Sequence, residues 1–251
     1  MTYILVTNDD GVNAPGILAL AQAMQRFGRV RVAAPATNQS ASGHKKTLFQ
    51  EIPYAYTELD GEIPAISITG SPADCIALSA LGAIDWPPTL VVSGINRGAN
   101  MGQDVTYSGT VSAALEASIH AVPAIAFSLD DHDADDPADY AESARIAGIV
   151  VERMLTHAPT LPPFTILNVN IPKVERVEGI RLTRQGIRIY RDELLRSHDR
   201  FQIVGDPPTG VLDEAGTDLW AVNNGYASLT PIHLDLTAHH FMAELAAWDI
   251  Q

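Results

Sequence analysis

Cysteine is almost absent from this chain, which holds a single one, Cys75, in 251 residues. One cysteine excludes an intramolecular disulfide and suits a reducing compartment. Because Cys75 lies in the apolar run Ala73–Ala83, we expect a small buried side chain rather than a nucleophile. The sequence enters a strand pattern at once, without a basic leader or a cleavage site of small residues. We therefore expect a cytoplasmic protein.

Long apolar runs and basic residues are also scarce. The longest apolar run, Val111–Leu129, is interrupted by Glu116, His120 and Pro123, so we expect no membrane span. The 16 Lys and Arg residues against 30 Asp and Glu residues give a net charge of −14. A field of this sign repels duplex nucleic acid and anionic membranes, so we expect neither as a partner. A small phosphate ligand stays compatible if a metal ion or backbone N–H groups supply local positive potential.

Several familiar catalytic motifs are missing. The chain has no lysine of the P-loop kind, and its glycine spacing does not match the dinucleotide fingerprint G-x-G-x-x-G. It also lacks a Ser-His-Asp order and a metalloprotease helix motif. The chemistry of this protein must therefore reside in other polar clusters.

The first half of the chain alternates strand-like and helix-like segments, which is typical of βαβ units and a mostly parallel sheet. The expected strands are Tyr3–Thr7, Val30–Ala34, Ala65–Thr69, Thr89–Ser93 and Ala124–Ser128, and the expected helices are Gly16–Phe27, Pro72–Leu81 and Thr110–Ala121. A run rich in aspartate, Asp130–Pro137, follows. It is interpreted as a solvated lead-in to a helix at Asp139–His157 in preference to a second metal site. Thr165–Ile171 is one more expected strand.

The pattern changes from Pro172 to about Gly225. Extended pieces such as Gly179–Arg184 mix with charged turns and the Gly/Pro-rich segment Gly205–Gly216. This composition indicates an arm that packs on another surface such as a second subunit, or else a mobile lid. Tyr226–Leu236 again alternates like a strand, and Ala238–Trp248 is an expected closing helix. We expect one α/β domain over residues 1–251, with a catalytic core at 1–130 and an oligomerisation arm and return strand at 172–235.

Two adjacent carboxylates, Asp9 and Asp10, directly follow the first expected strand and precede Gly11. Ligands of open α/β sheets bind at this carboxyl edge of the strands. Two neighbouring carboxylates repel each other unless a cation or a shared proton lies between them, and hard divalent cations prefer oxygen ligands. The pair therefore favours a metal site over the alternative, in which one aspartate caps the helix near Ala14 and the other is solvated.

Three more polar clusters are expected at the same edge. Ser93–Asp104 follows a strand and offers Asn96 and Asn100 as neutral oxygen donors; the alternative is a turn whose side chains bond their own backbone. Tyr107–Val111 opens a helix whose free N–H groups form an anion site, with Ser108 or Thr110 as the helix cap. Asn38–Lys46 contributes hydroxyl groups for a metal and His44, Lys45 or Lys46 for a phosphate, although each alone is typical of a surface loop.

Taken together, these segments closely resemble the SurE family of metal-dependent nucleotidases. The matching motifs are Asn8-Asp9-Asp10-Gly11 with Ala14-Pro15-Gly16, Ala34-Pro35 through Gln39-Ser40, Gly70–Cys75, Ser93–Asn96, Tyr107–Val111, and Leu229-Thr230-Pro231 with Asp235–His239. They occur in the family's order along nearly the whole chain. Two positions depart from the pattern, since Ala36 stands where the family usually has an aspartate and Ala41 where a glycine commonly follows the metal-binding serine.

The resemblance implies a Rossmann-like three-layer α/β/α fold with a mostly parallel sheet. It also implies a phosphomonoesterase that hydrolyses nucleoside monophosphates to nucleoside and phosphate. One Mg²⁺ or Mn²⁺ ion per subunit would be bound by Asp9, Asp10, Ser40 and Asn96, and homodimers or homotetramers would exchange C-terminal segments. The sequence leaves open the base, the 5′ or 3′ position, and exopolyphosphatase activity.

On this basis we hypothesise that the metal activates a water molecule, while Asn8 orients the phosphate or the water. Ser108, Gly109 and Thr110 would hold phosphate oxygens, and Asn100 would be a further substrate contact. Two alternatives stay open. One is an aspartyl-phosphate phosphatase with Asp9 as the nucleophile, although such enzymes use an Asp-x-Asp spacing. The other is a nucleotide sensor that binds without hydrolysis.

Overall fold

The computed structural model describes residues 2–157 and 161–248. Within them, one nine-stranded sheet carries the fold. Its strand order is β3 (Tyr54–Leu59), β4 (Ile63–Ile68), β2 (Arg29–Pro35), β1 (Tyr3–Thr7), β5 (Leu90–Arg97), β6 (Ala124–Asp130), β7 (Thr165–Pro172), β11 (Ala227–His233) and β8 (Ile180–Leu182). Most neighbours are parallel, and the pairs β3–β4 and β7–β11 are antiparallel. The expected mostly parallel sheet is confirmed.

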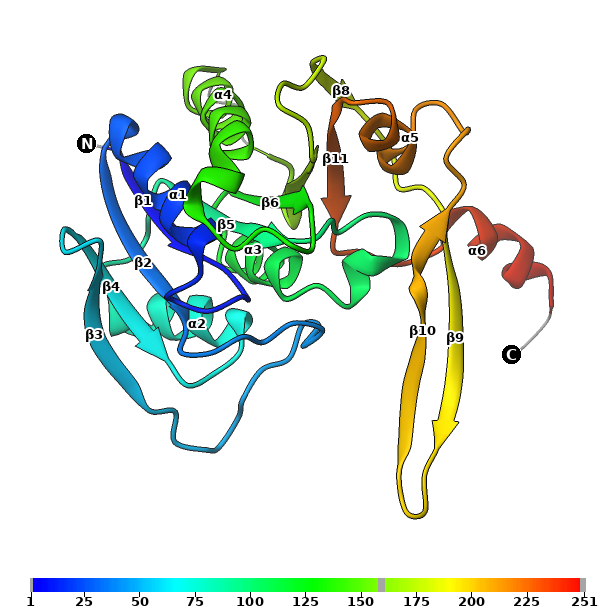
Figure 1. Ribbon diagram of the computed structural model, residues 1–251, viewed down its shortest axis with the longest axis horizontal. Helices are drawn as coiled ribbons and strands as arrows, with labels where there is room; N and C mark the ends of the chain where they lie inside the picture. Colours follow the sequence, from blue (N-terminus) through cyan, green and yellow to red (C-terminus); the bar gives the residue numbers. More distant parts are fainter. Residues whose placement is uncertain (1, 158–160, 249–251) are drawn as a thin grey trace.

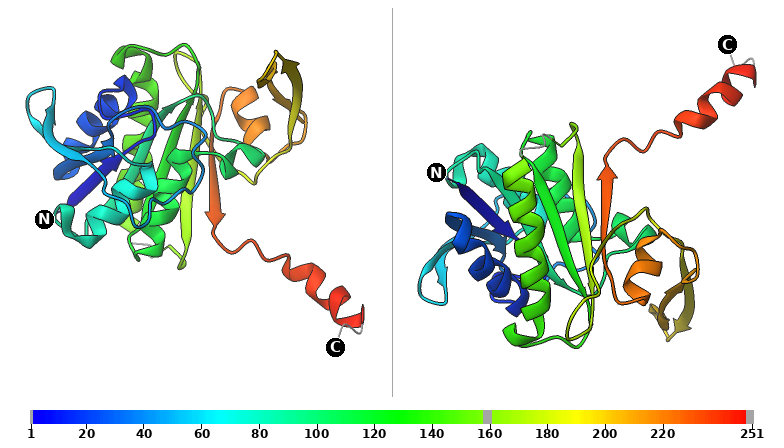
Figure 2. Two further views of the ribbon diagram at one scale, coloured as in Figure 1. Left: turned by 90° about the horizontal axis from the view of Figure 1, so that it is seen from below. Right: turned by 90° about the horizontal axis from the view of Figure 1, so that it is seen from above.

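Helices cover both faces of the sheet, as the edge-on views show (Figure 2). α1 (Pro15–Met24) and α4 (Ala141–His157) pack on one face, and α2 (Pro72–Leu78) and α3 (Gly109–Ile119) pack on the other. The side chains of β1 show the division, because Ile4 and Val6 enter the first core and Leu5 enters the second. This alternation is the period of two of a strand buried on both faces. The expected three-layer α/β/α fold is confirmed.

Local sequence accounts for several element boundaries. Ser71 and Asp74 form a reciprocal capping box at the start of α2, where Pro72 supplies a fixed φ. Asp136 and Asp139 cap the short 3₁₀ turn Pro137–Tyr140 that leads into α4. The acidic run is therefore a helix lead-in, as its sequence predicts. Cys75 is fully buried, as expected.

The structure departs from the sequence-based expectations in one strand end and adds elements that were not expected. β5 does not end at Ser93 but continues to Arg97, so the first part of the expected polar loop is strand. The Gly/Pro-rich segment Gly205–Gly216, for which no strand was named, begins within β10 (Phe201–Gly210). β3 and α5 (Asp218–Asn223) had no counterpart among the expected elements. β3 is an exposed antiparallel edge strand, so it lacks the apolar run by which the parallel strands are recognised.

An arm projects from the side of the body that carries β8, β11 and α5 (Asp218–Asn223) (Figure 1). It is a two-stranded hairpin of β9 (Arg188–Arg196) and β10, whose side chains are mostly exposed. The rest of the 172–235 segment belongs to the body, since β8 and β11 pair in the main sheet and α5 packs against β11. α6 (His239–Leu245) buries none of its residues and extends away from the body (Figure 2). Across the described ranges, no helix has the length and apolar character needed to cross a membrane.

Candidate functional site

The ends of β1 and β5 bring three of the predicted site residues to one place. Thr7 of β1 lies opposite Ser93 of β5 in parallel register. Asp9 and Asp10 follow Thr7 directly, and Asn96 lies three residues beyond Ser93 on the same edge. Because both strands are central and buried, their ends are fixed by the core beneath them.

Asp9 is the most enclosed carboxylate of this edge. Its residue is 3% exposed, and the hydroxyl group of Thr110 donates a hydrogen bond to its Oδ1. Burial raises the pKa of Asp9 from 3.8 to about 6, the hydrogen bond from Thr110 opposes this rise, and the charge of Asp10 adds to it. A carboxylate in such surroundings gains from a cation that replaces its proton.

Asp10 is oriented by two polar neighbours. The backbone N–H of Arg97 donates to its Oδ2 at 3.0 Å, and the side-chain amide of Asn38 donates to its Oδ1 at 3.3 Å. Burial raises its pKa, and the hydrogen bond from Arg97 opposes this. Asp10 therefore joins the β5 edge to the loop that carries Ser40.

Asn96 and Ser40 border the cavity beside Asp9. The side-chain nitrogen of Asn96 donates to the carbonyl oxygen of Gly98 at 2.7 Å, so its Oδ1 is the atom that is left to act as a ligand. Ser40 is exposed, and its backbone N–H donates to the side chain of Asn38 at 2.7 Å. Asn38 therefore helps to set the geometry of this loop, in which Ala36 and Ala41 depart from the family pattern.

Asn8 lies under the site. It is fully buried, its Nδ2 donates to the carbonyl oxygen of Gly11 at 2.8 Å, and its Oδ1 accepts from the N–H of Gly11 at 3.3 Å. Both ends of the amide therefore close the turn that presents Asp9 and Asp10. Asn8 does not border the cavity, so the structure does not place it beside Ser40 and Asn96.

The amino end of α3 faces the carboxylates. Ser108 caps the helix by accepting a hydrogen bond from the N–H of Val111 at 3.0 Å, and it also borders the cavity. Gly109 approaches Asp9 so closely that an added Cβ would lie 2.7 Å from the Asp9 Cβ. A helix start with free N–H groups favours an anion. Both the hydroxyl group and the backbone N–H of Thr110 bond to Asp9, and the N–H of Ser108 donates to the carbonyl oxygen of Asp104, so of these three residues the N–H of Gly109 is the backbone donor left for a phosphate.

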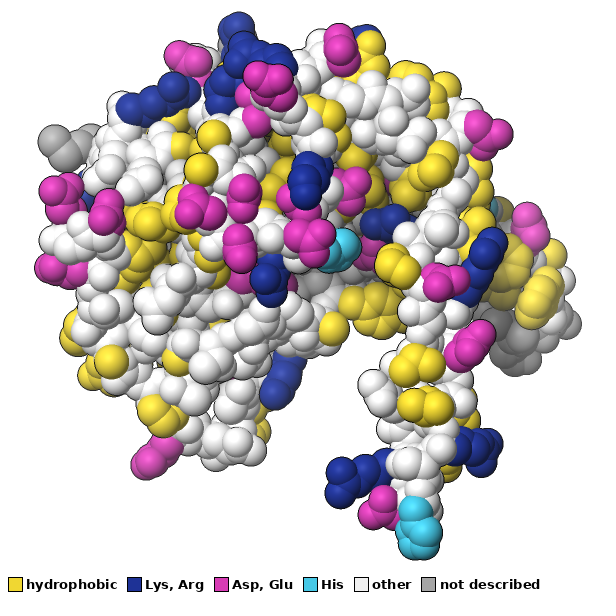
Figure 3. Space-filling model, viewed as in Figure 1, with side chains coloured by type: hydrophobic (Ala, Val, Ile, Leu, Met, Phe, Trp, Pro, Cys, Tyr) yellow, Lys and Arg dark blue, Asp and Glu magenta, His cyan; other side chains and the backbone are white. Residues whose placement is uncertain are grey.

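Asp9, Ser40, Asn96 and Ser108 open onto a cavity of about 620 Å³ between the strand ends and the root of the arm, whereas Asp10 does not border it. Its size lies in the range of small-molecule sites. The space-filling view shows the hollow where the arm meets the body (Figure 3). Besides the residues named above, its walls include Met101, Asp104, Tyr107, Asp130, His132, Arg188, Pro207, Pro208, Leu212, Leu219 and Val222.

The donor set fits a hard divalent cation. Asp9 and Asp10 supply charge, and Ser40 and Asn96 supply neutral oxygens, which is the chemistry that Mg²⁺ and Mn²⁺ prefer. In the part of the chain that the structure describes, no three His, Cys, Asp or Glu side chains gather closely enough to hold a metal ion. A site here therefore depends on the neutral donors as well as on the carboxylate pair.

Comparison with known proteins identifies the family. A family model described as survival protein SurE matches residues 4–192. The 5′-nucleotidase SurE of Chloroflexus aggregans is 44% identical over 256 residues, which cover 98% of this chain and 99% of the relative. The 5′-nucleotidase SurE 1 of Thermus thermophilus is 44% identical over 255 residues, 97% of this chain and 96% of the relative. The chain belongs to the SurE family.

The fold agrees with a solved SurE structure. The crystal structure of the SurE protein from Aquifex aeolicus superposes with a TM-score of 0.82 at 38% sequence identity, covering 98% of each chain. The aligned part therefore includes nearly all of the chain, from the first strand to the C-terminal segments.

Two asparagines of this SurE chain support the cavity floor and were missed from sequence. Asn168 and Asn170 of β7 are fully buried. Asn170 accepts from the N–H of Asn100 at 2.7 Å, and both side chains donate to the carbonyl oxygen of Asn100, at 2.8 and 3.1 Å. The side chain of Asn100 donates to Ser128 at 2.8 Å. The sequence feature that could have revealed them is a pair of asparagines two residues apart within an otherwise apolar strand.

The roles of His44 and Lys46 differ from the expected phosphate contact. Both side chains bind Glu116 of α3, at 2.9 and 2.7 Å, and neither borders the cavity. Burial alone would raise the pKa of Glu116, but hydrogen bonds from His44 and Lys46 and the charge of Lys46 lower it to about 2. The two residues therefore fasten the Ser40 loop to α3.

A second buried carboxylate holds the same loop. Asp74 accepts from the N–H and the hydroxyl of Thr47 at 2.7 and 2.8 Å, while Ser71 donates to the carbonyl oxygen of Lys45 at 2.5 Å. Neither Glu116 nor Asp74 carries a local sequence signal for this function, because their partners lie 70 and 27 residues away.

Proposed function

We propose that this protein is a metal-dependent phosphomonoesterase that hydrolyses nucleoside 5′-monophosphates to nucleoside and phosphate. The observation that carries the proposal is the convergence of Asp9, Ser40 and Asn96 on one cavity beside the amino end of α3, with Asp10 adjacent to Asp9 in the chain. The name 5′-nucleotidase, which similar full-length relatives carry, supports the same reaction.

Asp9, Asp10, Ser40 and Asn96 would hold one Mg²⁺ or Mn²⁺ ion. Such an ion lowers the pKa of water and neutralises charge on a phosphoryl group. Thr110 orients Asp9, and the N–H of Arg97 orients Asp10. Asn8 acts by holding the turn of the two aspartates through Gly11.

The amino end of α3 would bind phosphate oxygens through the backbone N–H of Gly109 and the hydroxyl group of Ser108, because the N–H of Ser108 donates to the carbonyl oxygen of Asp104 and Thr110 donates to Asp9. These groups are fixed before substrate arrives, because Ser108 caps the helix and Gly109 packs on Asp9. Fixed donors stabilise the charge that develops in the transition state. Asn100, held by Asn168 and Asn170, would contact the substrate from the cavity floor.

An aspartyl-phosphate mechanism is the alternative within the same reaction class. Asp9 is disfavoured as a nucleophile, because it is buried and accepts a hydrogen bond from Thr110. A single turnover in ¹⁸O-labelled water decides the question. We expect the label in released phosphate, and label in an enzyme carboxylate would contradict direct attack by water.

The proposal is tested by phosphate release over a panel of substrates, with and without EDTA, for wild type and Asp9→Asn. The panel includes 5′- and 3′-nucleotides and polyphosphate, which also measures the breadth of the activity. We expect release from 5′-nucleotides that EDTA and the substitution both abolish. Metal-independent release, or full activity in Asp9→Asn, would refute the site. Binding of a nucleotide with Mn²⁺ but without release would favour a sensor.

We also propose a homodimer or homotetramer, located in the cytoplasm. Exposed apolar side chains on the arm support assembly, among them Leu194, Phe201 and Ile203, at 52%, 71% and 77% exposure. α6 also lies away from the body with no buried residue, as expected of a segment that packs on a second copy. Light scattering over a range of concentrations measures the assembly.

A further inference from the structure

Asp104 lies between the start of α3 and the first residues of the arm, and its backbone and side chain bind different parts of the molecule. It belongs to the short 3₁₀ segment Gly102–Thr106, which leads directly into the cap of α3. Its carbonyl oxygen accepts hydrogen bonds from the N–H groups of Tyr107 and Ser108, at 2.9 and 3.1 Å. The backbone of Asp104 therefore holds the residue that caps α3 and borders the cavity.

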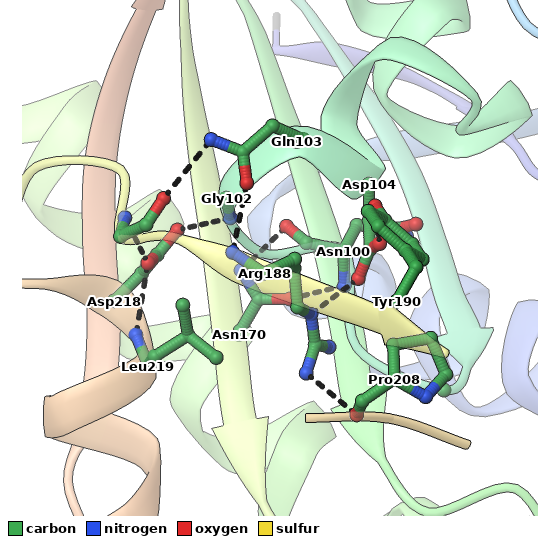
Figure 4. A network of polar contacts seen from close by, with 12 residues as sticks. Asn100, Gly102, Gln103, Asp104, Asn170, Arg188, Tyr190, Pro208, Asp218 and Leu219 are labelled. Atoms are coloured by element: carbon green, nitrogen blue, oxygen red, sulfur yellow. Dashed lines mark hydrogen bonds and ion pairs between the residues drawn. The ribbon is translucent and has the colours of Figure 1, made fainter. Parts of the chain in front are cut away.

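The carboxylate of Asp104 binds the first residues of β9. Nε of Arg188 donates to Oδ2 at 2.6 Å, and the hydroxyl group of Tyr190 donates to Oδ1 at 2.6 Å (Figure 4). The side chains of Asp104 and Arg188 are 18% and 12% exposed, so salt and water screen this ion pair much less than a pair on the open surface. Both carboxylate oxygens are thus used by the arm.

The two residues before Asp104 are also bonded to the arm or to α5. Oε1 of Gln103 accepts from the N–H of Arg188 at 2.8 Å, and Nε2 of Gln185 donates to the carbonyl oxygen of Gly102 at 2.9 Å. The buried carboxylate of Asp218, at the start of α5, accepts from the N–H of Gly102 at 2.9 Å (Figure 4). The segment is therefore restrained at three consecutive residues, and a shift of β9 is passed on to the start of α3.

We propose that Asp104 is a positioning residue through which the arm fixes the phosphate-binding start of α3. This inference rests on the proposed function, in which the hydroxyl group of Ser108 and the N–H of Gly109 bind phosphate oxygens. Groups that act on a reacting centre must be held in place before the reaction, and a displacement of about 1 Å can lower the rate about 100-fold. The arm therefore contributes to turnover as well as to assembly.

Direct contact with the substrate is a poorer explanation for this carboxylate. Asp104 borders the cavity, but its negative charge repels a phosphate group and both of its oxygens already accept hydrogen bonds from β9. Tyr190 distinguishes the two roles, because it binds Asp104 and does not itself border the cavity. A substitution of Tyr190 weakens the attachment of Asp104 and leaves the lining of the cavity as it is.

Two substitutions weaken the attachment to different degrees. Asp104→Asn removes the charge that binds Arg188, and Tyr190→Phe removes a single hydroxyl group. Asp192→Asn and Tyr56→Phe are the matched controls, because they make the same chemical changes at exposed side chains that do not border the cavity. Circular dichroism verifies that each variant is folded.

Steady-state kinetics with adenosine 5′-monophosphate at saturating Mn²⁺ measure turnover, and inhibition by inorganic phosphate measures the phosphate site. We expect kcat to fall about 30-fold in Asp104→Asn and about fivefold in Tyr190→Phe, with the inhibition constant of phosphate raised in the same order. The affinity for Mn²⁺, followed by electron paramagnetic resonance, should be unchanged in both variants. The two controls should resemble the wild type.

Two results would overturn the inference. An effect of Asp104→Asn without any effect of Tyr190→Phe would show that Asp104 contacts the substrate directly. A loss of Mn²⁺ affinity that parallels the loss of kcat would show that the arm supports the metal ligands instead. In the double variant the loss of kcat should be smaller than the product of the two single losses, because both substitutions act through one carboxylate.

Calorimetric titration with inorganic phosphate at saturating Mg²⁺ separates this inference from the proposed function. Weaker phosphate binding in Asp104→Asn and Tyr190→Phe, with no hydrolysis by the wild type, would leave the positioning role standing and refute the hydrolase. Hydrolysis at the wild-type rate by both variants, with equal phosphate binding, would do the reverse.

Discussion

The two sides of the cavity are built in different ways. The side that carries Asp9, Asp10 and Asn96 consists of the ends of two central strands, whose positions are set by the core below. The side that carries the Ser40 loop and the arm root has no such support. Its chain is held instead by three buried carboxylates that reach over long sequence distances, Glu116, Asp74 and Asp218.

The two sides of the cavity are therefore suited to different functions. Strand ends in a packed sheet can position a metal ion, because little in them can move independently of the core. Loops held by a few polar contacts can adjust to substrates of different shape. We therefore expect substitutions on the arm side, apart from Ser40 as a proposed metal ligand, to change stability, turnover or substrate preference, and substitutions on the strand side to change metal binding.

The largest effect on stability is expected for Asp218→Ala. The substitution leaves three buried N–H groups without their acceptor. At about 1–3 kcal/mol for each unsatisfied group, the free energy of unfolding should fall by at least about 3 kcal/mol. Urea denaturation measures this. Asp213→Ala, at a nearby exposed aspartate, should change it by less than about 0.5 kcal/mol. A loss no larger than that of the control would show that Asp218 does not hold the arm side.

A somewhat smaller effect is expected for Glu116→Gln, which weakens the contacts with His44 and Lys46. We expect a loss of about 2 kcal/mol near neutral pH, since Lys46 is partly exposed and water screens part of its interaction. The pKa of Glu116 is lowered to about 2, so its contribution is complete above the ordinary value of 4.5 and is lost as pH falls toward 2. Denaturation of both proteins at several pH values should show the difference shrinking over that range. A difference that is independent of pH would contradict the ion pair.

Asn170→Ala should have a smaller effect on stability and a clear effect on catalysis. It removes the hydrogen bonds that fix the backbone of Asn100, so kcat should fall roughly 10- to 100-fold while metal affinity stays unchanged. Kinetics at saturating Mn²⁺ measure this. A parallel loss of metal affinity would show instead that Asn170 also supports the strand ends that bind the metal.

The smallest effect is a pH dependence of metal binding. The pKa of Asp9 is raised to about 6 in the metal-free protein, so a proton competes with the cation below that pH. Apparent metal affinity should be constant above pH 6 and fall about tenfold per unit below it. The free energy of unfolding changes in the opposite direction. It should fall as pH rises from about 4 through 6, because the carboxylate of Asp9 becomes charged while it is buried. A metal affinity unchanged between pH 5 and 7 would contradict this environment for Asp9.

The strand side was predictable from sequence because its signals are local. Tyr3–Thr7 is an uninterrupted apolar run, Asp9 and Asp10 follow it closely in the chain, and Asn96 lies near the end of β5. The expected bounds of this first strand agree with the structure, whereas β5 begins one residue later than expected, at Leu90, and continues through Gly94 to Arg97.

The arm side was not predictable in the same way. His44 and Lys46 look like surface residues in the sequence, and only the fold brings Glu116 to them across 72 and 70 residues. Asp218 likewise lies 116 residues from Gly102. β9 and β10 carry few buried side chains, so they lack the periodicity by which strands are recognised.

Direct titration with Mn²⁺, followed by electron paramagnetic resonance at pH 7.5, tests the central claim that the strand ends hold the metal ion. The proteins compared are the wild type, Asp9→Asn and Leu212→Asn. We expect one Mn²⁺ per chain in the wild type and in Leu212→Asn, and an affinity at least about a hundredfold lower in Asp9→Asn. Unchanged Mn²⁺ binding in Asp9→Asn would contradict the account.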